Sequence, residues 1–133
     1  MNYAFDACAM IAYLHGEPGA TVVASMLADR TAVCYAHAIN LLEVYYDLIR
    51  RSDERTARQA LRILAADGVV ERRDMNKRFL RRVAQLKARG RISLADCFCI
   101  VLAQVVSGEV VTSDHHEFDA LVPLGLCPIR FIR

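Results

Sequence analysis

Residues 2–14 read N-Y-A-F-D-A-C-A-M-I-A-Y-L, a short apolar run that ends at an acid and continues into a helical pattern. The run Tyr3–Phe5 is typical of a buried strand. Asp6 follows it directly, where an acid can cap the predicted helix Ala7–His15. Strands that alternate with helices build parallel α/β sheets. This segment therefore predicts a parallel sheet with an acid at the carboxyl end of its first strand.

The same alternation continues along the chain. Further strands are predicted at Thr31–Tyr35, Val69–Glu71, Glu109–Thr112 and, at an edge, Pro128–Ile132. Further helices are predicted at Ala20–Asp29, His37–Arg51, Ser52–Asp67, Asp74–Gly90, Ser93–Ser107 and His116–Leu121, with Asp74 and Ser93 as caps. We therefore expect residues 1–133 to form a single α/β domain, a three-layer α/β/α sandwich with a mainly parallel sheet of about five strands.

Composition narrows the class of protein. The 55% hydrophobic content suits a well-buried core, and no apolar run reaches the roughly 18 residues of a membrane span. No basic stretch precedes an apolar one at the N-terminus, so we expect no signal peptide and a cytoplasmic location. The five cysteines are odd in number and contain no C-x-x-C, which favours reduced thiols. A zinc site built on Cys97 and Cys99 is an open alternative.

Charge is distributed unevenly along the chain. The net charge is +2, but the stretch from Arg50 to Arg91 has fourteen basic and five acidic residues, net +9, and the remainder is net −7. Fifteen of the seventeen basic residues are Arg, which suits bidentate contacts with phosphate. The alternative is a set of solvated helix faces. As a candidate RNA-binding face we take Arg78, Arg81, Arg82 and Arg89, with Arg55, Arg58 and Arg62 on the preceding helix.

Four acids stand where a metal-dependent nuclease needs them. Besides Asp6 they are Glu43 in N-L-L-E-V, Asp96 in S-L-A-D and Asp114 in V-V-T-S-D. Asp6, Asp96 and Asp114 also fit helix-capping positions, which is the structural alternative for each of them. Glu43 lies within a helical pattern among apolar residues, where it has no cap to form. Its alternative is an exposed stripe with Asp47.

Several carboxylates in one cleft need protons or a cation. Two like charges about 4 Å apart repel by about 4 kcal/mol at an effective dielectric of about 20. Such a cluster therefore takes up protons or binds a cation, and carboxylate oxygens suit Mg²⁺ or Mn²⁺. A water on the ion can act as nucleophile at phosphorus. The chemistry that follows is hydrolysis of a phosphodiester without a covalent enzyme intermediate.

The sequence resembles the PIN domain, and specifically a VapC-type toxin ribonuclease. Order and spacing match over nearly the whole chain, in F-D-A-C-A-M-I-A-Y-L, G-E-P-G-A, A-I-N-L-L-E-V, I-S-L-A-D-C-F-C-I-V-L-A and V-V-T-S-D-H-H-E-F-D. The resemblance implies Asp6, Glu43, Asp96 and Asp114 as the catalytic acids. Of these, we assign metal binding to Asp6, Asp96 and Asp114. Supporting roles for Asn40 and Thr112 are implied as well.

Several other residues near these motifs could contribute to the site. We take Glu117 and Asp119 as outer members of the acidic cluster, and leave the role of His115 and His116 undecided. Cys8 departs from the family pattern, which often has Ser or Thr two residues after the first acid. A thiol is the poorer hydrogen-bonding group, so Asp6 is expected to be oriented less firmly.

The resemblance also implies partners: an RNA substrate, a cognate VapB-like antitoxin and a second copy of the chain in a homodimer. Rival classes fit less well. A response-regulator receiver needs an acid after the third strand and a late Lys, but both lysines precede the fourth strand. A haloacid-dehalogenase-type phosphatase needs D-x-D, where this chain has D-A-C. The remaining alternative is a catalytically inactive PIN-like module that binds RNA or protein.

Overall fold

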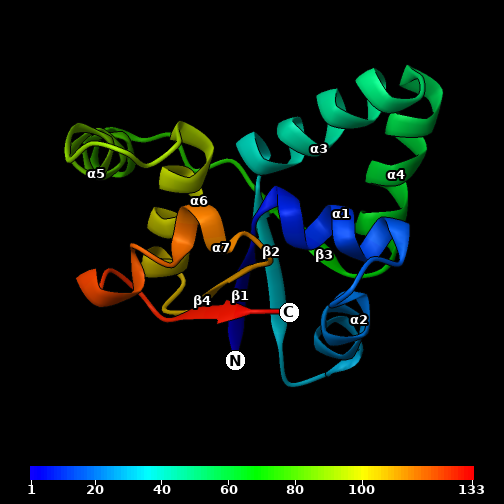
Figure 1. Cartoon of the computed structure of the whole chain (residues 1–133), viewed down its shortest axis with the longest axis horizontal. Coiled ribbons are helices and arrows are strands. Elements are labelled where there is room, and N and C mark those ends of the chain that lie inside the picture. The colour runs from blue at the N-terminus through cyan, green and yellow to red at the C-terminus, as the bar shows by residue number, and fades with distance from the viewer.

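Five parallel strands form one sheet in the computed structural model, which describes residues 1–133 (Figure 1). The strand order is β3-β2-β1-β4-β5, and every neighbouring pair is parallel. The strands are β1 (Asn2–Phe5), β2 (Val33–His37), β3 (Val69–Arg72), β4 (Glu109–Thr112) and β5 (Ile129–Phe131). The predicted α/β class, the five-stranded parallel sheet and its edge strand are confirmed.

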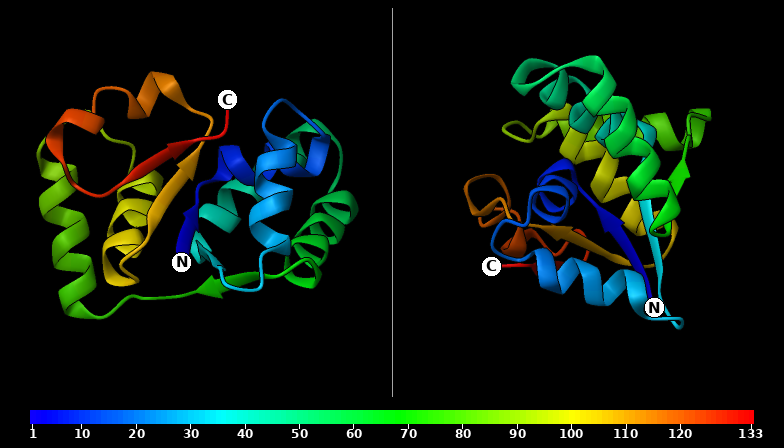
Figure 2. Two further views of the ribbon diagram at one scale, coloured as in Figure 1. Left: turned by 90° about the horizontal axis from the view of Figure 1, so that it is seen from below. Right: turned by 90° about the vertical axis from the view of Figure 1, so that its right-hand side faces the viewer.

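Helices cover both faces of the sheet, as Figure 2 shows. They are α1 (Ala7–His15), α2 (Ala20–Ala28), α3 (Ala38–Arg51), α4 (Glu54–Ala66), α5 (Lys77–Ala88), α6 (Leu94–Val105) and α7 (His115–Phe118), with a 3₁₀ turn η1 (Val122–Leu124). Side chains of α1 to α4 pack with Tyr3 and Phe5 of β1, whereas side chains of α5 to α7 pack with Ala4 of the same strand. Because neighbouring strand residues point to opposite faces, one strand feeds two cores. The result is a three-layer sandwich.

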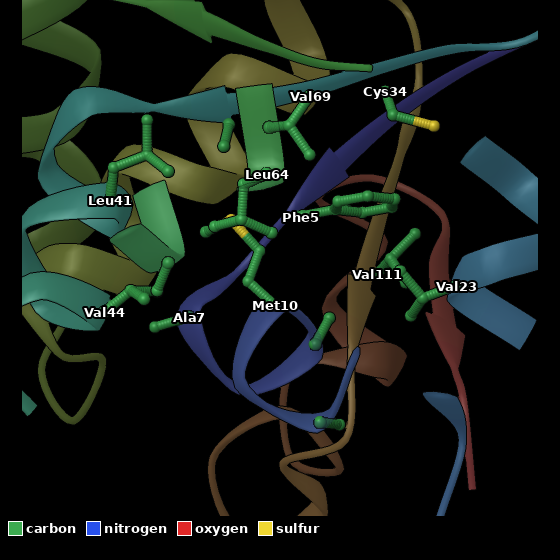
Figure 3. Close-up of a cluster of buried hydrophobic side chains, with 14 of the residues drawn as sticks. Phe5, Ala7, Met10, Val23, Cys34, Leu41, Val44, Leu64, Val69 and Val111 are labelled. Atoms are coloured by element: carbon green, nitrogen blue, oxygen red, sulfur yellow. The ribbon is translucent and has the colours of Figure 1, made fainter. Parts of the chain in front are cut away.

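The core on the α1 side holds the carboxyl end of β1 in place. Figure 3 shows Phe5 beside Met10 of α1, Val23 of α2 and Val111 of β4. Phe5 and Met10 are fully buried. Burial of a Phe or Met side chain contributes about 1.5–3 kcal/mol, so this contact fixes the strand end from which the chain enters α1.

Several predicted boundaries need correction. The second strand begins and ends two residues later than predicted, because His37 completes it and caps α3 through its ring nitrogen, 3.1 Å from the Ile39 amide. The cap of α5 is Asn76, not Asp74, since the Asn76 side chain accepts from the Phe79 amide at 2.9 Å. Asp74 instead binds the Arg72 guanidinium at 2.8 Å.

The helix predicted near the end of the chain also differs from the one observed. The helix predicted over His116–Leu121 is shorter in the structure, since α7 covers His115–Phe118, and the separate turn η1 follows at Val122–Leu124. The remaining helices agree with the predictions to within about two residues, a normal uncertainty for helix ends. None of the helices combines the length and the apolar character that crossing a membrane requires.

Candidate active site

Two of the predicted acids lie at the ends of neighbouring strands. Asp6 follows β1 and Asp114 lies two residues beyond β4, and these strands pair directly, with Phe5 opposite Val111. The Asp6 amide continues the pairing by donating to the Val111 carbonyl at 3.1 Å. Strand order changes direction here, since β2 lies on the other side of β1. Open parallel sheets bind ligands at such a switch point, beyond the carboxyl ends of the strands.

Thr112 connects these two acids. Asp6 is 2% exposed, and one of its oxygens caps α1 by accepting from the Ala9 amide at 2.8 Å. The Thr112 hydroxyl donates to the other oxygen. The same hydroxyl oxygen accepts from the Asp114 amide at 2.9 Å. Thr112 is itself buried, so it holds Asp6 in one orientation and fixes the backbone that carries Asp114.

Asp96 and Glu43 approach from two further helices. Ser93 caps α6 by accepting from the Asp96 amide at 3.2 Å, which places Asp96 in the first helical turn. Asn40 of α3 donates to the Ala95 carbonyl at 3.1 Å and so ties α3 to the start of α6. Glu43 follows Asn40 by three residues and is therefore on nearly the same face of α3.

The acids act on one another electrostatically. Burial raises the pKa of Asp6 to about 8, with smaller upward contributions from Asp96 and Glu43. Burial likewise raises the pKa of Asp96 to about 7, and Glu117, Glu43 and Asp114 add to that rise. The pKa of Glu43 is raised by burial and by the charges of Asp47 and Asp114. Residues from four separate segments therefore form one cluster.

Cys8 lies within this cluster. Its side chain is half-buried, and burial raises its pKa well above the usual range. The four carboxylates Asp6, Asp114, Glu43 and Asp96 each add to that rise. The thiol therefore remains protonated beside the acids, and the position at which the chain departs from the family pattern faces the candidate site.

The two outer acids have different surroundings. Glu117 accepts from the Ser93 amide at 2.7 Å, and its charge raises the pKa of Asp96, so it lies at the rim of the cluster. Asp119 does not join the cluster. Its side chain is 62% exposed and binds His115 Nδ1 at 2.8 Å. His115 also stacks on Phe131 of β5, with ring centroids 4.0 Å apart.

Asp47 of α3 also belongs to the acidic cluster, although the sequence placed it only in an alternative, an exposed stripe with Glu43. Of the neighbouring charges, Asp47 raises the pKa of Glu43 most, and its carboxylate forms an ion pair with Arg51 Nε at 3.0 Å. The signal was present, because Asn40, Glu43 and Asp47 share one face of the helix. The other undecided residue, His116, is exposed.

The residues present suit a hard divalent cation. The donors are carboxylates, joined by the Oδ1 of Asn40, which is buried and has no hydrogen-bond partner. The raised pKa values of Asp6 and Asp96 are those of carboxyls without a counter-cation. No three His, Cys, Asp or Glu side chains are arranged closely enough to hold an ion by themselves. An ion bound at these acids would therefore keep several of its waters, as Mg²⁺ usually does in proteins.

The arginines proposed for RNA binding divide into two kinds. Arg78, Arg81 and Arg89 are exposed on α5 or at its end. Arg82 is half-buried and donates to the Gln104 side chain of α6 at 2.6 Å. Arg82 therefore joins two helices, and the exposed three are the ones free to meet a ligand.

The fold is similar to that of several solved toxin–antitoxin proteins. A VapBC2 chain from Rickettsia felis, solved with a promoter DNA fragment, has a TM-score of 0.75 at 14% identity over 98% of both chains. A VapBC-1 chain from nontypeable Haemophilus influenzae has a TM-score of 0.71 at 18% identity, over 99% of this chain and 98% of that one.

The toxin VapC20 of Mycobacterium tuberculosis, described as cleaving the sarcin-ricin loop, has a TM-score of 0.70 at 16% identity. That match covers 90% of this chain and 95% of the toxin. No curated protein matches the sequence. The PIN domain pattern matches residues 3–122, which include β1 from Tyr3 onward, β4 and all four acids. By this match and by its fold, the chain belongs to the PIN domain family.

Proposed function

We propose that this protein is a Mg²⁺- or Mn²⁺-dependent endoribonuclease and the toxin component of a type II toxin–antitoxin system. The observation that carries the proposal is the convergence of Asp6, Glu43, Asp96 and Asp114 at the switch point of the sheet, with raised pKa values for the first three. Membership of the PIN domain family supports it, as does the similar fold of a toxin described as cleaving the sarcin-ricin loop.

Each residue of the candidate site has a distinct role in the proposed reaction. Asp6, Asp96 and Asp114 would hold the cation, which when bound polarises the phosphoryl group and activates water. Thr112 keeps one oxygen of Asp6 oriented, and Asn40 keeps the start of α6 against α3. Burial and the neighbouring acids raise the pKa of Glu43, so it is a stronger base than a free carboxylate and can orient the attacking water and accept its proton.

Matched substitutions test this assignment. Asp6→Asn and Asp96→Asn keep the size of the side chain and remove the charge, so each should abolish most RNA cleavage while the far-ultraviolet circular dichroism is unchanged. Asp119→Asn is the control, because this acid is exposed and bound to His115. Cleavage by EDTA-treated protein at the wild-type rate, or equal activity of Asp96→Asn and wild type, would contradict the proposal.

Substrate must be held away from the acids, which repel RNA. We propose that the exposed face of α5 supplies this attraction, since its arginines lie within the net +9 stretch. Arg82 is a poor test residue because it is bonded to Gln104. Arg78→Ala combined with Arg81→Ala should weaken binding of single-stranded RNA and flatten the slope of log K against log salt by about 1 to 1.5. An unchanged slope would make this face a solvated helix surface only.

An antitoxin is the proposed protein partner, in line with the solved toxin–antitoxin complexes of similar fold. Three apolar side chains of α3, Leu42, Tyr46 and Ile49, are exposed at i, i+4 and i+7. Glu43 and Asp47 flank this stripe. The pattern fits a partner segment with an apolar face and an Arg that pairs with the carboxylates.

Co-expression tests the partner. A co-purified antitoxin should block RNA cleavage, and Tyr46→Asp should release it while leaving cleavage by the free chain intact. Retention of the antitoxin by Tyr46→Asp would place its docking surface elsewhere. Strong expression of this chain alone should arrest growth. Normal growth would contradict the toxin assignment but not the nuclease.

A homodimer is proposed from the family resemblance, and analytical ultracentrifugation of the isolated chain measures it.

The alternative function is an inactive PIN-like binding module. Such a module would bind RNA without metal and would not cleave it. Assays of RNA binding and of RNA cleavage, each with and without Mn²⁺, distinguish the two functions.

A further inference from the structure

A hollow of about 680 Å³ lies between the turn that joins α5 to α6 and the segment formed by α7 and η1. Figure 1 shows these two segments on the same side of the sheet. The hollow adjoins the acidic cluster, because Glu117 forms part of its wall. Glu117 in turn binds the Ser93 amide at 2.7 Å and raises the pKa of Asp96. A ligand in this hollow would therefore be a neighbour of any group bound at the acids.

The lining combines two chemistries. Ile92 and Leu121 are buried at its base, and Leu124 is 55% exposed beside them. Arg89 and Arg91 stand on the rim, and both are exposed. Neither guanidinium takes part in an ion pair or a side-chain hydrogen bond, whereas Arg72, Arg73 and Arg130 are each paired with an acid. An apolar wall and two free cations thus face one space.

This combination matches one nucleotide of a single strand. A nucleobase presents flat apolar faces to a wall such as Leu121 and Leu124, and its phosphate is an anion that Arg binds well. The volume lies within the usual range for small-ligand sites, about 300–1,000 Å³. A purely apolar partner would leave the two guanidinium groups unused, and a purely anionic one would leave Leu124 exposed.

We propose that this hollow, the Arg91–Leu124 pocket, binds the nucleotide next to the scissile phosphodiester and sets a base preference at that position. The inference rests on the proposed nuclease function. Arg89 and Arg91 hold the phosphate, and Leu121 with Leu124 contacts the base. His116 also lines the hollow, so the base preference comes from the fit of the base against these aliphatic groups and against the face of one imidazole ring.

Two variants separate the two chemistries. Arg91→Ala should weaken binding of a fluorescein-labelled single-stranded RNA about fivefold at low salt and reduce the salt slope by about 0.7. Leu124→Ser should weaken it by a similar factor, about fivefold, with the salt slope unchanged, because only apolar contact is lost. Controls are Arg30→Ala, an exposed Arg distant in sequence, and Val122→Ser. Val122 is exposed on the same turn η1 but does not line the hollow.

Binding is measured by fluorescence anisotropy in EDTA, so the result does not depend on cleavage. Cut sites are then mapped with Mn²⁺ on an RNA of randomised sequence. Leu124→Ser should lose the base preference at one position beside the cut and keep the others. If Leu124→Ser and Val122→Ser have the same RNA affinity and the same cut-site preference, the proposed pocket is wrong, although the nuclease proposal is unaffected. If the wild-type protein does not cleave RNA, but Arg91→Ala and Leu124→Ser alone lose binding, the hollow is a nucleotide-binding pocket and the nuclease proposal fails.

Discussion

The buried carboxyl of Asp6 predicts that the metal-free protein loses stability as the pH rises. Its folded pKa is about 8, and its ordinary value is 3.8. Between these values the folded state binds the proton that the unfolded state has released. The free energy of unfolding therefore falls with increasing pH across this window, and falls no further above about pH 8.

The magnitude follows from the size of the shift. Each pKa unit corresponds to about 1.4 kcal/mol, so the window between pH 5 and pH 8 accounts for a loss of about 4 kcal/mol. Water entry and relaxation around the ionised group reduce this figure. Asp6→Asn removes the ionisable group and retains an oxygen that can cap α1. It loses the Thr112 hydrogen bond to the carboxylate, at a cost of about 1 kcal/mol.

Urea unfolding in EDTA at pH 5 and pH 8 measures the effect. Wild type should lose several kcal/mol between the two values. Asp6→Asn should lose less and be the more stable protein at pH 8, although Asp96, whose folded pKa is about 7, still contributes a loss in both proteins. Mg²⁺ should restore stability to wild type at pH 8 but not to the variant, because a bound cation favours the ionised carboxylate. Asp119→Asn should behave as wild type. Parallel pH profiles for wild type and Asp6→Asn would refute the reasoning.

Three further predictions concern the scaffold. Arg82→Ala should lower the free energy of unfolding by about 1 to 2 kcal/mol, because Arg82 bonds to α6, while Arg81→Ala should change it by less than about 0.5 kcal/mol in the same urea titration. Burial lowers the pKa of His37, so unfolding should become easier as the pH falls below about 6.5, and this acid-side loss should be absent in His37→Asn. Gly108→Ala should destabilise by about 1 to 3 kcal/mol in thermal unfolding, because its Cβ would lie 2.4 Å from the Asn2 carbonyl oxygen.

The sequence predicted those features that depend on local pattern. Apolar periodicity located every strand and nearly every helix, and the acids after Phe5 and Thr112 pointed to strand ends that the sheet then placed side by side. The edge position of the last strand was predicted as well. What failed was a boundary such as that of β2, where His37 is at once the last strand residue and the cap of the next helix.

Tertiary contacts decided the remaining cases. Glu117 and Asp119 are two residues apart in one acidic segment, and no local rule separates them. Glu117 turns inward because the Ser93 amide, 24 residues away in the chain, donates a hydrogen bond to its carboxylate. Asp119 turns outward because His115 is already stacked on Phe131 of the edge strand. Both outcomes depend on which elements pack together.

Capping and catalysis are not competing explanations for the acids. Asp6 caps α1 and Asp114 caps α7 through their side chains, while Asp96 lies in the first turn of α6. The N-termini of three helices are thus directed at the cluster, and their positive dipole ends offset part of the repulsion between carboxylates. Glu43 is the exception, since it lies beyond the first turn of α3 and has no such compensation. A fold that brings helix starts to a sheet's switch point can therefore carry buried acids there before any cation arrives, and the same hydrogen bonds that stabilise the helices hold the ligands ready.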